Sequence, residues 1–242
     1  MPVRPTLRPV SGPTVSPFLL AEPGAVSRRI EALGIPRLLR AGEHLYRQGE
    51  GASSFHVVAT GRVRIHMLRP DGTVRVISWA EPGASLGEGV CFDGGPHPVT
   101  ATAAGACRVL SVGRDVLVEA ARDDPELLVE VVRRVAHKQR VLHLHVFLDG
   151  LPARERVTVL LGHLVEAYGE GALGTAGTGG ISARLSVRPA VDELALMIGL
   201  TRVTTSRELS RLVAEGVLVK DGRSIVVRDL AALRRRVDAV AV

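Results

Sequence analysis

Hydrophobic and polar residues alternate with a period of two along much of the first half of the chain. In the clearest run, residues 62–67, arginine or histidine stands at every second position, with valine, isoleucine and methionine between them. Residues 70–73 read Pro-Asp-Gly-Thr, a turn signal, and residues 74–79 resume a β-type sequence. Several short runs of this kind, separated by glycines between residues 42 and 112, predict a small all-β barrel or sandwich.

The segment ahead of these strands has a different character. Residues 1–24 are rich in proline, which predicts an unstructured arm and would also break the apolar segment of a signal peptide. A short helical pattern then runs from Val26 to about Leu39 and is interrupted at residues 34–36, Gly-Ile-Pro.

A long helical pattern from Asp124 to about Leu148 carries two apolar faces. Asp124 suits the N-cap and Pro125 the first helical position. One face repeats with alternating spacings of four and three, which is a heptad seam; it comprises Leu128, Val132, Val135, Gln139, Leu142 and Val146. The other comprises Leu127, Val131, Val141, Leu144 and Leu148. A helix that packs only on its own β domain needs one apolar face, so two faces favour a homodimer with the seam as its interface.

The last third of the chain predicts a second kind of domain. Residues 150–152, Gly-Leu-Pro, indicate a hinge; a helix is expected over 153–168 and a flexible glycine-rich loop over 169–180. Residues 189–198 form a helical pattern that ends at Gly199, and Thr201 can cap a second helix. Two helices joined in this way, followed by a basic hairpin over residues 216–227, predict a winged helix-turn-helix.

The second helix of this motif carries the residues suited to DNA. Arg202, Ser206 and Arg207 are the predicted base readers, and Thr204 and Arg211 are expected to contact phosphates, because such donors match base edges and phosphate oxygens. Val203 adds an apolar side chain that suits a thymine methyl group.

The composition agrees with binding to nucleic acid and excludes other classes of protein. The 242 residues carry a net charge of +6, and residues 181–242 hold 11 lysines and arginines against 7 aspartates and glutamates, a net charge of +4. A hydrophobic fraction of 46% with 23% charged residues is typical of a globular protein. No apolar run approaches the ~18 residues of a membrane span, and no hydrolase, metalloprotease or nucleotide-binding motif of an enzyme occurs. We therefore expect a soluble, cytoplasmic, non-enzymatic protein.

From about residue 38 to 235 the chain resembles the CRP/FNR family, the cyclic-AMP receptor protein and its relatives. The shared landmarks are glycines 42, 49, 61 and 83, the Gly87-Glu88 pair, the long helix and the winged helix-turn-helix. The resemblance implies an α+β fold with a flexible arm (1–24), a β-roll sensor domain (25–123), a dimerisation helix (124–149) and a DNA-binding domain (150–242). It also implies a homodimer on pseudo-palindromic double-stranded DNA and, for an activator, contact with RNA polymerase.

The sequence departs from the cyclic-AMP-binding members at the effector pocket. Those members place an Arg-Ser pair after the Gly-Glu element, where the arginine neutralises the cyclic phosphate, but here Pro98 and Val99 stand in that place. Lys138 and Gln139 stand where a hydroxyl pair would contact adenine. An anionic phosphate without a counter-charge is costly to bury, so Gly87 and Glu88 would remain from a degenerate pocket that does not use cyclic AMP.

Other effectors remain as alternatives. Two cysteines, Cys91 and Cys107, are too few for an intramolecular iron–sulfur cluster. His97 and Cys91 are candidates for a haem or redox role, and His97 or Arg108 for a substitute phosphate partner; no cofactor or metal is predicted. Cyclic di-GMP would require arginines, for which the candidates are Arg62, Arg64, Arg133 and Arg134, although the last two also fit a solvated helix face. A regulatory nucleotide-binding module of a kinase or channel is disfavoured because such modules lack a helix-turn-helix.

Overall fold

The structure is a computed structural model that describes residue 16 and residues 18–20, 28–174, 181–186, 189–221 and 224–240. These residues divide into two compact units, and the boundary falls inside one long helix, between His145 and Val146.

The first unit is built from two β-sheets. One has the strand order β1-β6-β5-β8-β3 and the other the order β2-β9-β4-β7. All neighbouring strands are antiparallel except β1, which is parallel to β6. The strands are β1 (Leu19–Leu20), β2 (Ile35–Leu39), β3 (His44–Tyr46), β4 (Ser54–Thr60), β5 (Val63–Leu68), β6 (Val74–Ala80), β7 (Ser85–Leu86), β8 (Thr100–Ala103) and β9 (Cys107–Gly113). The predicted β domain is therefore confirmed.

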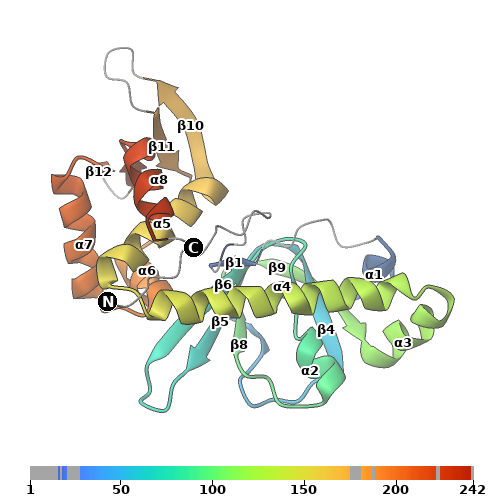
Figure 1. Ribbon diagram of the computed structural model, residues 1–242. Helices are drawn as coiled ribbons and strands as arrows, with labels where there is room; N and C mark the ends of the chain where they lie inside the picture. The colour runs from blue at the N-terminus through green and yellow to red at the C-terminus, as the bar shows by residue number, and fades with distance from the viewer. Residues whose placement is uncertain are drawn as a thin grey trace, which may run out of the picture. The chain divides into compact units, whose positions relative to one another are not determined.

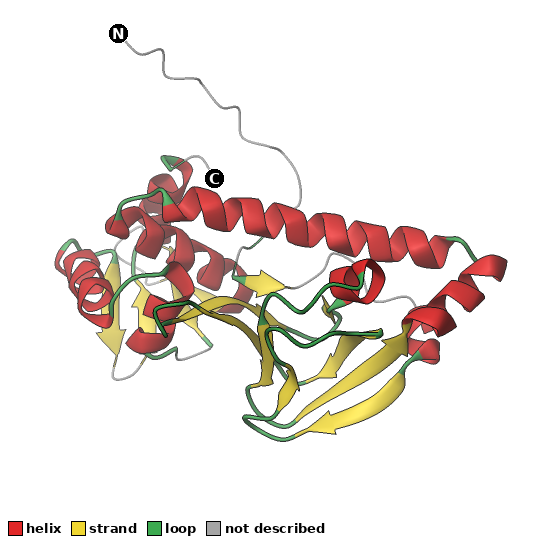
Figure 2. Cartoon of the chain, turned by 90° about the horizontal axis from the view of Figure 1, so that it is seen from below, coloured by secondary structure: helices red, strands yellow, loops and turns green. Residues whose placement is uncertain are grey.

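Four helices accompany these strands: α1 (Arg28–Leu33), α2 (Glu88–Asp93), α3 (Arg114–Asp123) and α4 (Glu126–Asp149). Helix α4 runs alongside the strands in both views (Figures 1 and 2). It inserts Val141 into the core between the two sheets and Leu127 and Val131 into a second core beside α3. Of the apolar face expected to pack on the β domain, Leu127, Val131 and Val141 are buried in these cores, whereas Leu144 is only partly buried. Leu148 is buried but belongs to the second unit.

Two expectations for the first unit are wrong. The first concerns residues 18–20 of the expected unstructured arm (1–24), because Leu19 and Leu20 form β1, and Phe18 is fully buried with its ring edge-on to His145. The apolar Phe-Leu-Leu sequence gains more by covering the edge of β6 than by remaining in water. The rest of that arm lies outside the described residues, apart from Ser16.

The second is the helical pattern from Val26 to Leu39, which is interrupted at residues 34–36 as expected but does not resume as a helix. Helix α1 ends at Leu33, and Ile35–Leu39 pairs with β9 as an edge strand, where Pro36 is tolerated. Helix α3, which no sequence signal predicts, follows β9 directly.

The second unit has a four-stranded sheet with the order β10-β11-β13-β12; helices α5, α7 and α8 pack against it, and α6 packs on α5 and α7. Its elements are α5 (Ala153–Tyr168), β10 (Gly169–Gly174), β11 (Ile181–Leu185), α6 (Val191–Ile198), α7 (Arg202–Ala214), β12 (Leu218–Asp221), β13 (Ser224–Val227) and α8 (Leu230–Asp238). Residues 169–174, expected to be part of a flexible loop, instead form a strand that pairs with β11; residues 175–180 lie outside the described residues. Cross-strand pairing overrides the low strand propensity of glycine here.

Gly61, between β4 and β5, provides a test of the β-unit packing. Its φ of +82° is unfavourable for any residue with a Cβ, and a Cβ there would lie 2.6 Å from the Ala106 carbonyl oxygen. Gly61→Ala should lower the free energy of unfolding by about 1–2 kcal/mol for the left-handed backbone and by a further ~1–3 kcal/mol for the clash. Denaturation followed by the fluorescence of Trp79, the single tryptophan, measures this loss.

Gly72→Ala is the matched control. Gly72 has nearly the same φ, +81°, but a Cβ there would meet no atom of the described residues within 4 Å. Its loss should be confined to the backbone contribution. Equal losses in the two variants would contradict the close approach at Gly61.

Candidate nucleic-acid interface and ligand cavity

The helix-turn-helix of the second unit is formed by α6 and α7. Gly199 adopts φ +64°, which reverses the chain after α6, and the Leu200 N–H donates to the Ala195 carbonyl at 3.0 Å. Thr201 then caps α7 by accepting the Thr204 N–H at 3.1 Å, as predicted. Leu194, Ile198, Leu209 and Leu212 are buried between the helices and their neighbours. The predicted motif is confirmed.

Helix α7 presents a basic outer face. The side chains of Arg202, Arg207 and Arg211 are all more than half exposed, and Val203 is 75% exposed. Thr204 and Ser206 were expected to be exposed, but both are half-buried and lie at the margin of this face. The Thr204 hydroxyl also accepts a hydrogen bond from Thr201 at 2.9 Å.

Sequence reasoning missed Glu208, which lies beneath this basic face. Its carboxylate is almost completely buried; Oε1 accepts from Arg211 Nη1 at 2.8 Å and lies 3.8 Å from Arg207 Nε. Its other oxygen, Oε2, is buried without a hydrogen-bond partner among the described residues. A buried carboxylate is strongly attracted to the cations that it can reach. Glu208 therefore restricts where the two guanidinium groups can lie. The available signal was its i, i+3 spacing from Arg211.

The hairpin after α7 also forms. Strands β12 and β13 pair antiparallel with Lys220 opposite Ile225 and Asp221 opposite Ser224. The turn residues Gly222 and Arg223, which belong to the predicted wing, lie outside the described residues.

The first unit contains a cavity of about 390 Å³ between the strands, α2 and α4. All six residues predicted for the effector pocket line it: Gly87, Glu88, Pro98, Val99, Lys138 and Gln139. Its other walls are mainly apolar and include Leu20, Ile65, Ile77, Leu86, Val90, Val141 and Leu142. The structure thus brings together residues from distant parts of the chain.

Glu88 and Lys138 form an ion pair at the wall of this cavity. Glu88 is buried, and the Lys138 Nζ that contacts its Oε1 also donates to the Ser85 carbonyl at 2.5 Å. Ser85 Oγ donates to Glu88 Oε1 at 3.1 Å. Burial acts to raise the pKa of Glu88, but the Lys138 charge and these hydrogen bonds outweigh it and hold the pKa below its ordinary value. The carboxylate is therefore ionised and already satisfied by the protein.

An aromatic pair forms another part of the wall. The rings of Tyr46 and His97 stack with centroids 3.7 Å apart and planes within 4° of parallel. His97 is buried, and burial lowers its pKa, so the imidazole is neutral at pH 7.

The structure places the other candidate effector groups away from the cavity. Arg62, Arg64, Arg108, Arg133, Arg134 and Cys91 are absent from its lining. Arg62 lies over the Trp79 ring. Arg134 was expected on a solvated helix face, but it is buried, pairs with Glu130 at 2.8 Å and donates to the Gly83 carbonyl at 3.0 Å. Burial raises the pKa of the Cys91 and Cys107 thiols, both of which are free and buried.

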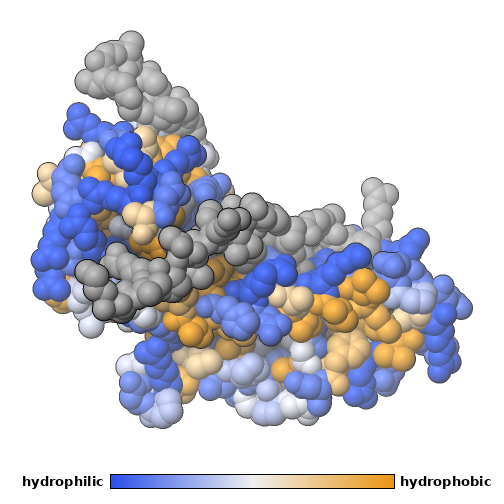
Figure 3. Space-filling model, in the orientation of Figure 1, coloured by the Kyte–Doolittle hydropathy of each residue, from blue (hydrophilic) through white to orange (hydrophobic). Residues whose placement is uncertain are grey.

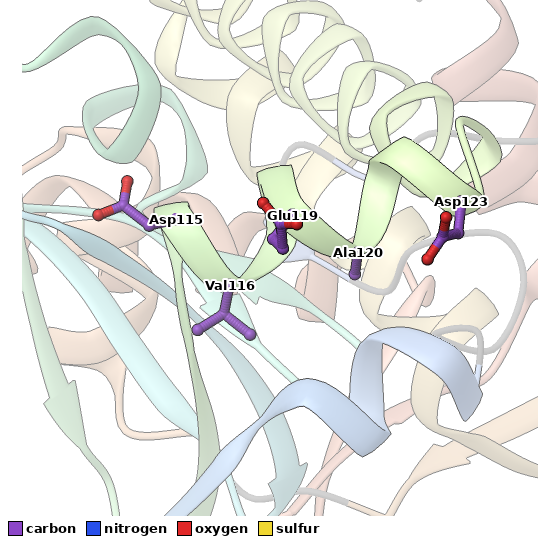
Figure 4. A pocket seen from close by; sticks show the side chains of 5 residues that line it. All are labelled: Asp115, Val116, Glu119, Ala120 and Asp123. Carbon is purple, nitrogen blue, oxygen red and sulfur yellow. The ribbon is translucent and has the colours of Figure 1, made fainter.

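A second, shallow hollow lies on α3. Asp115, Glu119 and Asp123 line it together with Val116 and Ala120, and their carboxylates follow one side of the helix (Figure 4). The described residues of this lining carry three negative charges and include no basic residue, which makes the hollow unsuitable for an anionic nucleotide.

The heptad seam of α4 is exposed to solvent. Leu128, Val132, Val135, Leu142 and Val146 are 38–74% exposed. Apolar side chains gather along the line of α4 in Figure 3. Val135, Gln139 and Leu142 belong to the seam and also line the cavity. Apolar side chains exposed at this spacing are of the kind that a partner helix buries.

Among the described residues, no group of three or more histidine, cysteine, aspartate or glutamate side chains is placed to hold a metal ion. No described helix combines the length and apolar character needed to cross a membrane.

Comparisons with known proteins match both parts of the chain. Residues 36–124 match the cyclic nucleotide-binding domain family, and residues 155–236 match the Crp-like helix-turn-helix domain family. The chain is 26% identical to the CRP-like cAMP-activated global transcriptional regulator of Mycobacterium tuberculosis, over 90% of this chain and 95% of that protein.

It is also 30% identical to the nitrogen fixation regulation protein FixK of Rhizobium meliloti, over 82% of this chain and 87% of that protein. The solved structure of FixK2 from Bradyrhizobium japonicum superposes with a TM-score of 0.67 at 28% identity, covering 84% of this chain and 96% of that one. The chain therefore belongs to the CRP/FNR family of DNA-binding transcription regulators.

Proposed function

We propose that the protein is a homodimeric, sequence-specific transcription regulator whose β-roll cavity does not use cyclic AMP. One α7 helix per protomer enters the major groove of each half of a pseudo-palindromic site. We assign the sensor role to residues 25–123, dimerisation to residues 124–149 and DNA binding to residues 150–242. A regulator of this kind acts in the compartment that holds bacterial DNA, the cytoplasm.

The single observation that best supports DNA recognition is the exposed basic face of α7. Three arginines project from one helix whose opposite side is buried, and Thr201 fixes the start of that helix. We assign base contacts to Arg202, Ser206 and Arg207 and phosphate contacts to Thr204 and Arg211. Val203 stands where the family commonly has a glutamate, so we propose a half-site with thymine at the base that this position reads.

The exposed seam of α4 supports the homodimer. A second copy of the same stripe satisfies its heptad spacing and removes five apolar side chains from water. Val135, Gln139 and Leu142 would then link the dimer interface directly to the cavity, because they line both.

The charge of the cavity wall supports the absence of cyclic-AMP control, in contrast to the activation named for the M. tuberculosis relative. Glu88, the group expected to bind a ribose hydroxyl, is occupied by Lys138 and Ser85. Pro98 and Val99 offer neither a cation nor a hydroxyl to a phosphate. A buried cyclic phosphate would therefore lack its counter-charge.

Arg207→Ala should remove about 1–3 kcal/mol of discrimination at one base of each half-site, since a guanidinium reads guanine by paired hydrogen bonds. Selection of binding sites from random DNA measures the change. Arg235→Ala is the control, because it removes the same charge from an exposed position on α8. If the base preference of the Arg207→Ala variant equals that of the control, Arg207 does not read a base.

Glu208→Gln should reduce the ratio of specific to non-specific affinity several-fold while overall affinity for DNA rises. The arginines lose the charge that orients them, and a negative charge near phosphate is removed. Titration of specific and random duplexes at several salt concentrations separates the two effects. Glu193→Gln on α6 carries the same charge change without contacting Arg207 or Arg211; an identical specificity ratio in the two variants would refute orientation by Glu208.

Val132→Glu should weaken the dimer by at least about tenfold, because two copies of the charge meet across a seam that buries valine. Sedimentation velocity over a concentration series gives the dissociation constant. Val129→Glu changes an exposed valine on the same helix outside the seam and should leave the dimer intact. Equal weakening by both substitutions would show that the interface is not the heptad seam.

A further inference from the structure

The β-roll cavity has the dimensions and the lining of a site for a small organic molecule. Its volume of about 390 Å³ falls within the ~300–1,000 Å³ typical of such sites. Half of the described residues that line it are leucine, isoleucine or valine, most of them on the strands and on α4. Burial of apolar ligand surface against these walls would be the main source of affinity.

The charges that the described residues place at the wall are balanced. Among the described lining residues, Glu88 is the only acidic residue and Lys138 the only lysine or arginine, and they are paired with each other. Lys138 also contacts the carbonyl and hydroxyl oxygens of Ser85. An incoming anion would have to take Lys138 from Glu88 and leave that carboxylate buried without a counter-charge.

The polar groups left at the wall suit an uncharged partner. Ser78 lies in the lining, as does the stacked pair of Tyr46 and His97. Flat aromatic side chains of this kind pack well against another ring, with geometry that adds to simple area burial. A ring of a ligand would therefore fit beside the aromatic pair, and the aliphatic parts of the ligand would fit beside the branched side chains.

We infer that this cavity binds a neutral, predominantly apolar ring compound in place of a cyclic nucleotide. The inference rests on the proposed function in one respect, namely that the cavity has lost its use of cyclic AMP. It goes beyond that proposal by naming the chemical class of the ligand. Charge decides the class: a neutral ring compound fills the cavity without disturbing the Glu88–Lys138 pair, whereas a phosphate or carboxylate must break it.

The experiment is a fluorescence titration of the full-length protein with two dyes that share one ring system. N-phenyl-1-naphthylamine is neutral, and 8-anilino-1-naphthalenesulfonate adds a sulfonate to the same skeleton. The neutral dye should bind at one site per chain, and the sulfonate should bind at least about tenfold more weakly, because it lacks a counter-charge. Equal or tighter binding of the sulfonate would overturn the inference.

Cavity-filling variants test whether the dye binds in this cavity. Val99→Phe and Ile77→Phe each enlarge a partly buried side chain of the lining, so each should weaken the neutral dye by at least about tenfold. Val118→Phe makes the same valine change at an exposed position of α3 and should leave binding unaltered. Circular dichroism checks that each variant folds. If only one of the two lining variants folds, that variant alone is sufficient for the test. Unchanged dye binding in a folded lining variant would overturn the inference.

Two further measurements separate this inference from the proposed function. Calorimetry with cyclic AMP should show no binding, and tight binding would overturn both. Affinity for a selected DNA site is measured in parallel on the wild type. If the wild type binds that DNA, ignores cyclic AMP and fails to bind the neutral dye, the ligand class is wrong while the proposed function stands.

Discussion

Helix α4 must bury one apolar face on its own β domain, and much of the first unit is arranged around that requirement. Leu127 and Val131 enter one core and Val141 the other, each contributing roughly 1.5–3 kcal/mol on burial. Once these residues fix the rotation of the helix, Lys138 faces Glu88 and Arg134 faces the Gly83 carbonyl. The same rotation directs the heptad seam outward. Packing, the cavity wall and the exposed stripe therefore follow from one constraint.

Two buried carboxylates show how charge is used in the two units. Glu88 is neutralised by Lys138 and Ser85, which makes an otherwise apolar cavity electrically balanced. Glu208 attracts Arg211 and approaches Arg207, which leaves those arginines directed and still more than half exposed. In the function that we propose, the first pair leaves no free cation for an anionic ligand, and the second keeps two cations exposed for anionic DNA. A buried carboxylate is too costly to leave unpaired, so in both places it determines where the neighbouring cations lie.

Sequence patterns predict the structure correctly where the signal is local or strongly periodic. The alternation over residues 62–67 predicts β5, the heptad spacings predict α4, and Gly199 with Thr201 predicts the turn of the helix-turn-helix. The patterns fail where distant pairing decides the outcome. Residues 169–174 form a strand because β11 lies beside them, and Phe18 is buried because β6 offers an edge. Neither partner is visible in a short window of sequence.

The order of residues is sufficient to specify the two kinds of domain, the family and six residues of the cavity lining, but it does not reveal the buried Glu208 beneath the basic face of α7. The spacing of apolar residues alone specifies which face of a helix is apolar. The presence of Pro98 and Val99 in place of an arginine-serine pair can likewise be recognised from the sequence. The balance of charges, by contrast, is settled by packing in three dimensions. Lys138 and Glu88 are 50 positions apart, and the solvated face expected for Arg134 proved to be buried. Pairing depends on the direction of side chains across packed elements, and that direction exists only after the β domain and α4 have come together.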